Sequence, residues 1–199
     1  TNNIYSLWLA RDLMAQDDTL LLESDLIFED AVLDAALHSE CRNVALVANY
    51  DTWMDGTMVK IDDDNNIVNF IPKKAFNYDD TDSYYKTVNI YKFTREFITD
   101  RYLPFLEAYI KVLGENEYYE QVLRVITLID SCDLKALPVT GMHWYEIDDV
   151  QDLRIAETIF APPALRLEKM QKSFGGYWRY SGVLDFCYLV NPYFPRRRM

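Results

Sequence analysis

The sequence lacks the features that mark secreted, membrane-spanning and nucleic-acid-binding proteins. Its 199 residues include 3 cysteines, which are far apart, have no metal-ligand spacing and, being odd in number, argue against a disulfide framework. No apolar run approaches the roughly 18 residues that a membrane helix needs, and the polar start of the chain does not resemble a signal peptide. We therefore expect a cytoplasmic protein with reduced cysteines and no membrane span.

Positive charge is also scarce. The chain has 20 lysines and arginines against 32 aspartates and glutamates, which gives a net charge of −12. Proteins that bind the phosphate backbone of nucleic acids rely on clustered basic side chains, so we expect no nucleic-acid partner. Any phosphate ligand would have to be accompanied by a metal ion.

Helical and extended patterns alternate up to about residue 161. The expected helices are 4–14, 29–37, 96–113, 118–129 and 150–160, and the expected strands are 19–22, 43–48, 56–61, 66–71, 87–93, 133–138 and 143–147. A run of turn-forming residues at 62–65 indicates that the strands on either side of it form a hairpin. Together, these helices and strands predict a mixed α/β domain, whose ligand crevice should lie outside the carboxyl ends of its strands.

Two aspartates stand at or close to the ends of apolar runs. Asp25 follows the leucines at 20–22 closely, and Asp148 follows the apolar segment that ends at Ile147. Each could lie where a strand ends, and two such carboxylates can hold one Mg²⁺ together with substrate phosphates, as phosphoryl or nucleotidyl transfer requires. The alternative is that each aspartate is the N-cap of a following helix.

The pattern changes at Pro162 and Pro163, which cannot continue a helix. A new helix at 164–174 should end at Gly175 and Gly176. The rest of the chain is rich in aromatic residues and too short to fold alone. We expect it to pack on the first domain, on a second copy in a homodimer, or on a partner domain that is missing here.

Four segments carry a family resemblance: residues 2–7, Glu23-Ser24-Asp25, residues 116–119 and residues 146–152. They occur in the same order in the nucleotidyltransferase family, and the chain most resembles the CTP:phosphocholine cytidylyltransferases over about residues 1–160. The resemblance implies an α/β fold with a three-layer mixed sheet, as in nucleotide-diphospho-sugar transferases. It also implies Mg²⁺-dependent transfer of CMP from CTP, or of another nucleotide, to phosphocholine or a similar phosphorylated amino-alcohol. Asp25 and Asp148 match the metal-binding catalytic residues.

The resemblance also assigns residues to the substrates. Asn3 and Ser6 match a segment beside the nucleotide, and Tyr118 and Tyr119 match the acceptor pocket. A cage of aromatic and acidic residues could surround a quaternary ammonium group, and its candidates are Trp53, Tyr91, Tyr118, Tyr119 and either Glu117 or Glu120. Ordinary core packing is the alternative, because the chain has 15 tyrosines and 10 phenylalanines. Lys73 and Lys74 could reach the acceptor phosphate, with Lys74 in a catalytic role, or be solvated loop lysines.

The chain departs from the family at both ends. It has no glycine-rich loop followed by a basic residue, which in the family cradles the triphosphate. Its first residue resembles a point inside the family's domain, so we expect the nucleotide half of the site to be missing and this fragment to be inactive. Residues 175–199 resemble the opening of an aminotransferase domain of the histidinol-phosphate aminotransferase type.

These departures predict a multifunctional parent protein. Its nucleotidyltransferase-like domain would end with residues 1–161, and residues 162–199 would be a linker and the start of the aminotransferase-like domain. No pyridoxal phosphate is expected here, because its lysine would lie beyond Met199. Two other functions stay open. One is a sugar-1-phosphate nucleotidyltransferase, which would need a polar pocket for hydroxyl groups, and the other is an inactive domain that only packs against an aminotransferase.

Overall fold

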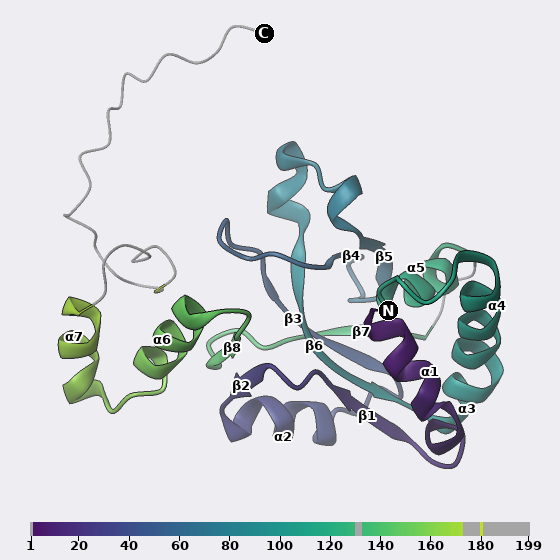
Figure 1. Cartoon of the computed structure of the whole chain (residues 1–199), viewed down its shortest axis with the longest axis horizontal. Coiled ribbons are helices and arrows are strands. Elements are labelled where there is room, and N and C mark those ends of the chain that lie inside the picture. Colours follow the sequence, from purple (N-terminus) through teal and green to yellow (C-terminus); the bar gives the residue numbers. More distant parts are fainter. Residues whose placement is uncertain (1, 130–132, 173–179, 181–199) are drawn as a thin grey trace, which may run out of the picture. The chain divides into compact units, whose positions relative to one another are not determined.

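The computed structural model of the chain describes residues 2–129, 133–172 and 180. The chain forms two units, of which the first runs from Thr1 to Asp148 and the second begins at Asp149. Figure 1 shows that the first unit mixes helices and strands and contains all the strands that are described. The fold of this unit therefore determines where the candidate site lies.

The first unit is built on a six-stranded sheet with the order β5-β4-β6-β3-β7, in which β1 also pairs with β6. The strands are β1 (Thr19–Leu22), β3 (Val44–Asn49), β4 (Met58–Ile61), β5 (Ile67–Ile71), β6 (Tyr85–Phe93) and β7 (Lys135–Pro138). The sheet is mixed, because β3 and β7 run parallel whereas β6 is antiparallel to β1, β3 and β4. A separate antiparallel pair joins β2 (Leu26–Phe28) to β8 (Trp144–Glu146).

The long strand β6 changes neighbours along one of its edges. Tyr85 and Lys86 pair with β4, and the residues from Ile90 to Phe93 pair with β1. Strand β3 occupies the opposite edge, since it pairs with some of the same residues as β1 does. Residues 87–89 therefore lie at a gap between the end of β1 and the start of β4, where side chains from several segments can converge.

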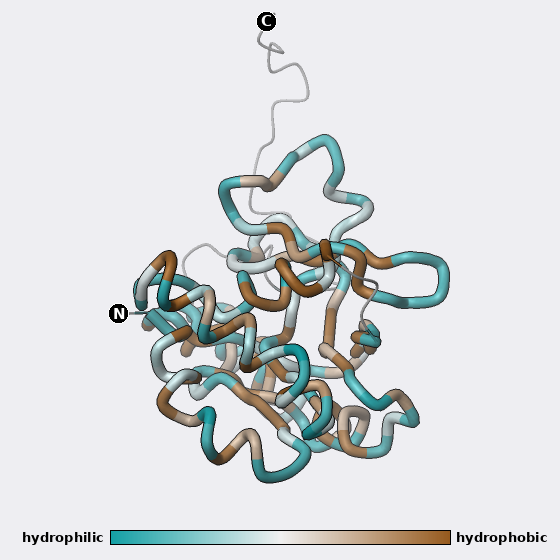
Figure 2. Tube along the Cα trace, turned by 90° about the vertical axis from the view of Figure 1, so that its right-hand side faces the viewer, coloured by the Kyte–Doolittle hydropathy of each residue, from teal (hydrophilic) through white to brown (hydrophobic). Residues whose placement is uncertain are grey.

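Helices cover both faces of this sheet, as Figure 1 shows. Successive residues of a strand point to opposite faces, and residues of β3 and β6 accordingly divide between two core clusters: Ala45, Val47, Tyr91 and Phe93 in one, and Val44, Leu46, Val88 and Ile90 in the other. The first cluster includes side chains of α1 (Asn3–Met14), α4 (Leu103–Leu113) and α5 (Glu120–Ile129), and the second includes side chains of α2 (Asp30–His38). Figure 2 shows hydrophilic residues at the outward loops. The result is a layer of sheet between two layers of helix.

Most of the expected elements are present with ends shifted by a few residues, and three features differ. The helix expected at 96–113 is a helical segment of three parts: α3 (Arg95–Phe97), a π-helical part (Ile98–Tyr102) and α4. Strand β2 has no counterpart in the sequence pattern, because three residues are too few to show an alternation. The helix expected from residue 118 begins at Glu120. Short 3₁₀ turns occupy Lys73–Ala75 and Tyr78–Ser83.

The second unit contains α6 (Val150–Ile159) and α7 (Pro163–Gln171). Asp149 is the N-cap of α6, since its Oδ1 accepts hydrogen bonds from the backbone N–H groups of Gln151 at 2.7 Å and Asp152 at 2.9 Å. The N-cap position of α2 is occupied by Glu29. The interpretation of Asp25 and Asp148 as helix N-caps is therefore wrong.

Several predictions concern residues outside the described part of the chain. They include the helix stop at Gly175 and Gly176, the docking of the aromatic tail and its likeness to an aminotransferase. The division of the chain into 1–161 and 162–199 also stays a prediction. Within the described ranges, no helix is both long enough and apolar enough to cross a membrane.

Candidate functional site

Three carboxylate side chains meet at the gap along β6. Glu23 directly follows β1, Asp25 directly precedes β2, and Glu146 is the last residue of β8. One ligand oxygen from each residue lies within 4.8 Å of the other two. The pairing of β2 with β8 fixes this arrangement, because Leu26 lies opposite Glu146 and the N–H of Ile147 donates to the carbonyl oxygen of Asp25 at 2.9 Å.

Asn89 of β6 connects two of these carboxylates. Its Nδ2 donates to Glu23 Oε2 at 3.0 Å and to Glu146 Oε1 at 2.9 Å. The Thr87 hydroxyl can donate to Asn89 Oδ1 at 2.8 Å, which favours this orientation of the amide. Asn89 has a φ of 59°, in the left-handed region, which asparagine adopts more readily than most other L-residues but which is unusual inside a strand. The hydrogen bonds of its side chain help to stabilise this conformation.

The remaining oxygens of the two glutamates have other partners. Asn3 of α1 donates from Nδ2 to Glu23 Oε1 at 3.2 Å, and its Oδ1 accepts from the N–H of Tyr119 at 3.0 Å. Lys86 Nζ lies 3.0 Å from Glu146 Oε2. A carboxylate oxygen has two lone pairs, so each of these oxygens can still accept from a further ligand.

Lys86 is a buried lysine, with only 2% of its side chain exposed. A buried ammonium group needs a paired charge, and Glu146 supplies it. Gly56, with a φ of +93°, lets the backbone come close, because a Cβ at this position would lie 3.1 Å from Lys86 Nζ. One ammonium group is thus set against three carboxyl groups in the cluster, those of Glu23, Asp25 and Glu146.

Burial and mutual repulsion raise the pKa of two carboxyl groups in the cluster. For Glu23 the largest cause is burial, and the charges of Asp25 and Glu146 act in the same direction. For Glu146 burial again raises the pKa, and the ammonium group of Lys86 opposes it. A raised pKa means that the charged form is insufficiently compensated, so a cation bound among these carboxylates would be stabilised by them.

A further acidic group adjoins the cluster. Glu120, the first residue of α5, is 4% exposed, and burial together with the charge of Glu23 raises its pKa to about 8. Its Oε2 and the hydroxyl groups of Tyr91 and Tyr119 are buried and have no hydrogen-bond partner among the described residues. The Tyr119 hydroxyl is close enough to lower the pKa of Glu23, although the pair lacks hydrogen-bond geometry. Such unsatisfied groups are typical of a place that a polar ligand or ordered water completes.

Of the two predicted metal-binding aspartates, Asp25 belongs to the cluster. Its Oδ1 is buried and finds no hydrogen-bond donor in the part of the chain that the structure describes. Asp148 is exposed and follows Glu146 by two positions, near enough that its charge raises the pKa of the Glu146 carboxyl group. The convergence of Asp25 and Asp148 on one cation stays a prediction.

The aromatic residues of the predicted cage lie in different surroundings. Tyr91 and Tyr119 meet edge to face with ring centroids 5.9 Å apart, and both rings belong to the hydrophobic core. Trp53 stacks on Tyr145 at 5.2 Å. Tyr118 is 54% exposed. Core packing therefore accounts for the rings of Tyr91 and Tyr119, whereas it leaves their hydroxyl groups without a role.

The other predicted site residues lie nearer the surface. Ser6 on α1 is exposed, and Glu117 is half-buried. Lys73 pairs with Asp55, with Nζ and Oδ2 2.6 Å apart, and Lys74 is exposed beside it. A phosphate group would have to compete with Asp55 for Lys73.

Sequence reasoning does not single out Glu23 and Glu146 as members of the carboxylate cluster. A signal was available, because both motifs have the pattern Glu-x-Asp, in Glu23-Ser24-Asp25 and in Glu146-Ile147-Asp148. It also misses Lys86 and Asn89, whose signal is a polar side chain inside the buried strand β6.

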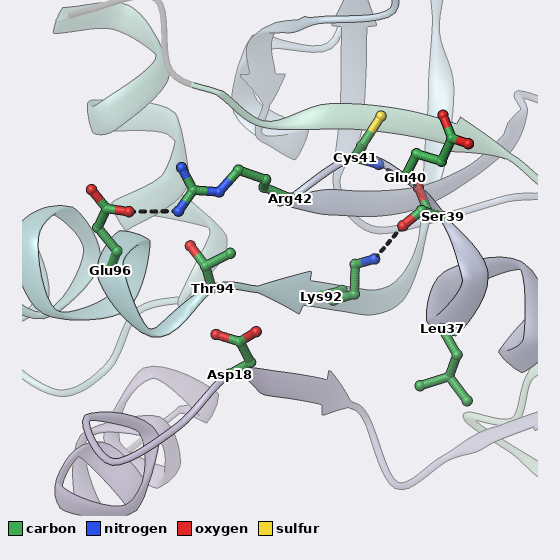
Figure 3. A pocket seen from close by; sticks show the side chains of 9 residues that line it. All are labelled: Asp18, Leu37, Ser39, Glu40, Cys41, Arg42, Lys92, Thr94 and Glu96. Atoms are coloured by element: carbon green, nitrogen blue, oxygen red, sulfur yellow. Dashed lines mark hydrogen bonds and ion pairs between the residues drawn. The ribbon is translucent and has the colours of Figure 1, made fainter.

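A separate hollow of about 540 Å³ lies at the C-terminal end of β6 (Figure 3). Its basic side chains already have partners, since Arg42 Nη2 lies 2.5 Å from Glu96 Oε2 and Lys92 Nζ donates to the carbonyl oxygen of Ser39 at 2.8 Å. None of the predicted site residues lines it. It is therefore distinct from the carboxylate cluster.

Comparison with known proteins gives one curated relative and several similar structures, while no family model matches the chain. The relative is CMP-5'-(3-aminopropyl)phosphonate synthase from Streptomyces rubellomurinus, which is 31% identical over 201 residues. The match covers 100% of this chain and 32% of the relative. The chain thus spans about a third of the length of this relative.

Nucleotidyltransferases are among the similar solved structures. One of them, named as a glucose-1-phosphate thymidylyltransferase from Bacillus anthracis, matches with a TM-score of 0.54 and 15% identity, covering 88% of this chain and 64% of that one. The CTP:phosphocholine cytidylyltransferase from Streptococcus pneumoniae matches with a TM-score of 0.62 and 20% identity, covering 80% of this chain and 64% of that one. The inositol-1-phosphate CTP transferase from T. maritima matches with a TM-score of 0.55 and 18% identity, covering 86% of this chain and 62% of that one. These matches confirm the predicted fold class, an α/β nucleotidyltransferase-like fold with a mixed sheet.

Proposed function

We propose that the chain provides the metal site and the acceptor side of a Mg²⁺-dependent nucleotidyltransferase, which transfers CMP from CTP to a small acceptor. The acceptor would carry a phosphate or phosphonate at one end and a positively charged nitrogen at the other. The observation that carries this proposal is the cluster of Glu23, Asp25 and Glu146. The choice of cytidine is supported by the relative and by two of the structural neighbours, which are named for CMP or CTP, whereas another neighbour is named as a thymidylyltransferase.

The residues of the cluster suit a magnesium ion. Mg²⁺ prefers oxygen ligands and is usually held by one or two carboxylates together with substrate phosphates. The buried Oδ1 of Asp25, which lacks a donor among the described residues, fits the role of a ligand. We assign Asp25 to hold the ion together with Glu23 and Glu146, and Asp148, two positions after Glu146, stays the candidate for a further ligand. When bound, Mg²⁺ would neutralise negative charge on the phosphate oxygens of the substrates.

The proposed reaction needs no nucleophile from the protein. A phosphate or phosphonate oxygen of the acceptor attacks the α-phosphorus of CTP in line, a new P–O bond forms, and the bond to the departing pyrophosphate breaks. The side chains bind and orient. Lys86 offsets part of the carboxylate charge, and Asn3 and Asn89 hold Glu23 in place. We further assign Ser6 to the nucleotide side.

The nitrogen end of the acceptor is assigned to the region of Glu120. A positively charged nitrogen there would favour the ionised form of Glu120 and would be a partner for its Oε2. It would also be a partner for the hydroxyl groups of Tyr91 and Tyr119, which otherwise lack one among the described residues. The relative is named for an aminopropyl phosphonate and one structural neighbour for phosphocholine, and both of these compounds contain such a nitrogen. A sugar phosphate would supply hydroxyl groups but no positive charge, so it would not shift Glu120 toward its ionised form.

The residues around this region stay candidates for the rest of the acceptor. Trp53 and Tyr118 would face its apolar part, and Glu117 would add negative charge near the nitrogen. Lys73 and Lys74 would approach the phosphate or phosphonate group, which requires Lys73 to leave Asp55.

Acceptor binding to the 199-residue chain tests the proposal, because it does not need the triphosphate cradle. In calorimetric titrations with Mg²⁺ present, 3-aminopropylphosphonate should bind at least about tenfold more tightly than propylphosphonate, which lacks the nitrogen. Glu120→Gln should remove most of this difference, and Glu107→Gln, at an exposed residue of α4, should leave it unchanged. Preferential binding of glucose-1-phosphate would favour the sugar-phosphate alternative.

A further inference from the structure

Asn89 combines three features that seldom occur together. It lies inside strand β6, it is 4% exposed, and its φ is 59°. Among the described residues, the other non-glycine residue with a positive φ is Asn65, at 60°, in the exposed turn between β4 and β5, where this conformation is common. Unusual backbone conformations in a buried strand cluster at functional sites, because the contacts they permit outweigh their cost.

The contacts at Asn89 are with two negative groups that repel each other. The amide of Asn89 has two hydrogens, and Nδ2 donates to Glu23 Oε2 at 3.0 Å and to Glu146 Oε1 at 2.9 Å. The charge of Glu146 is one of the causes that raise the pKa of Glu23. A neutral donor placed between the two carboxylates allows them to stay close together without adding a charge that would compete with a cation.

The surroundings favour one orientation of this donor. The hydroxyl of Thr87, two positions earlier on β6, can donate its one proton to Asn89 Oδ1 at 2.8 Å or to the carbonyl oxygen of Thr57 at 3.0 Å. The shorter of these contacts and the two carboxylates favour the same orientation, in which the amide nitrogen faces the carboxylates. The carbonyl oxygen of Asn89 accepts from the N–H of Glu23 at 3.3 Å, which ties the end of β1 to the same residue. The backbone and the side chain of Asn89 therefore both bind Glu23, one through its N–H group and the other through its carboxylate.

We propose that Asn89 is a positioning residue that holds Glu23 and Glu146 in a pair ready to receive a divalent cation beside Asp25. The inference rests on the proposed function, since it takes the carboxylate cluster as a metal site. Asn89 occupies one lone pair of one oxygen on each glutamate. Asn3 and Lys86 bind the second oxygen of Glu23 and of Glu146, respectively, and each of these oxygens keeps a further lone pair for a cation. Residues that orient metal ligands in this way typically change metal affinity by about 10–100-fold when they are removed.

Replacement by glycine separates the amide from the backbone conformation. Asn89→Gly removes the two hydrogen bonds to the glutamates and the contact with Thr87, whereas glycine adopts a φ of 59° without strain. With Mn²⁺ as the probe, which like Mg²⁺ suits carboxylate ligands, we expect the variant to bind at least about tenfold more weakly than the wild-type chain. Asn65→Gly is the matched control, because it makes the same change at a left-handed asparagine outside the cluster, and its Mn²⁺ affinity should equal that of the wild type.

Metal binding is measured by calorimetry or by the electron paramagnetic resonance of free Mn²⁺, with circular dichroism to show that each variant is folded. A folded Asn89→Gly chain that binds Mn²⁺ as tightly as the wild type overturns the role of Asn89 and leaves the metal site standing. A wild-type chain that binds no Mn²⁺ overturns both the metal site and this inference.

A second variant decides the matter if Asn89→Gly does not fold. Thr87→Val keeps the shape of a buried side chain and removes the hydroxyl group, which contacts Asn89 Oδ1 and the carbonyl oxygen of Thr57. The Thr57 carbonyl oxygen keeps the backbone N–H of residue 87 as a donor. The variant should weaken Mn²⁺ binding in the same direction by a smaller factor. Unchanged affinity in Thr87→Val, together with loss of folding in Asn89→Gly, would show that Asn89 has a structural role alone and overturn the proposal.

Discussion

Among single residues, the surroundings of Glu120 strongly change the pKa of its carboxyl group. Burial and the charge of Glu23 raise its pKa from an ordinary value of 4.5 to about 8. Between these two pH values the folded chain holds a proton that the unfolded chain has released, so the stability of the fold decreases as the pH rises from about 4.5 to about 8. Below this window both states are protonated, and Glu120 has no effect on the pH dependence.

Glu120→Gln should remove this part of the pH dependence, because glutamine is similar in shape and does not ionise. Thermal unfolding measured from about pH 5 to about pH 9 should show the variant gaining stability relative to the wild type as the pH rises. Glu107→Gln is the control, since Lys111 lowers the pKa of the exposed Glu107. Unfolding curves whose midpoints shift in parallel for the wild type and Glu120→Gln would contradict the raised pKa.

The sequence indicates some of the site residues and hides others. Asp25 and Asp148 stand out because each ends an apolar run, and the same Glu-x-Asp pattern would have pointed to Glu23 and Glu146. Asn89 could not be assigned in the same way. Its role depends on a left-handed backbone inside a strand and on partners 66 and 57 positions away, and no local pattern encodes either.

Among the elements, the hairpin of β4 and β5 was predictable because its turn is specified locally. Asp62 Oδ1 accepts from the N–H groups of Asp64 at 3.0 Å and Asn66 at 2.8 Å, and Asn65 takes the positive φ. Strand β2 was not predictable, since its three residues become a strand only through pairing with β8. This pairing explains why Asp25 leads into a strand, whereas the sequence suggested a helix.

The N-cap hydrogen bonds of Asp149 should stabilise the first turn of α6. Asp149→Ala removes two hydrogen bonds from the first turn of the helix and should destabilise it by about 1 kcal/mol, whereas Asp149→Asn keeps an oxygen acceptor and should have little effect. The loss is measurable as a lower amide-exchange protection of α6. Equal protection in the alanine and asparagine variants would mean that the side chain of Asp149 does not cap the helix.

On the scale of the whole molecule, the layered architecture follows from the sequence better than the site does. Buried strands and amphipathic helices of ordinary length alternate, and such a pattern favours a sheet with helices on both faces. The site needs more information, because it lies where β6 exchanges β4 for β1 along one edge. That gap is a property of tertiary pairing, and it gathers Glu23, Asn89 and Glu146 from three separate parts of the chain.

The central claim is that the carboxylates at this gap bind a divalent cation. The most direct measurement is a Mn²⁺ titration of the 199-residue chain, in which Asp25→Asn is compared with Asp12→Asn, whose side chain is 83% exposed on α1. We predict binding at one site in the wild type, at least about tenfold weaker binding in Asp25→Asn, and unchanged binding in Asp12→Asn. Equal Mn²⁺ affinity in the wild type and Asp25→Asn, or no binding at all, would contradict the account.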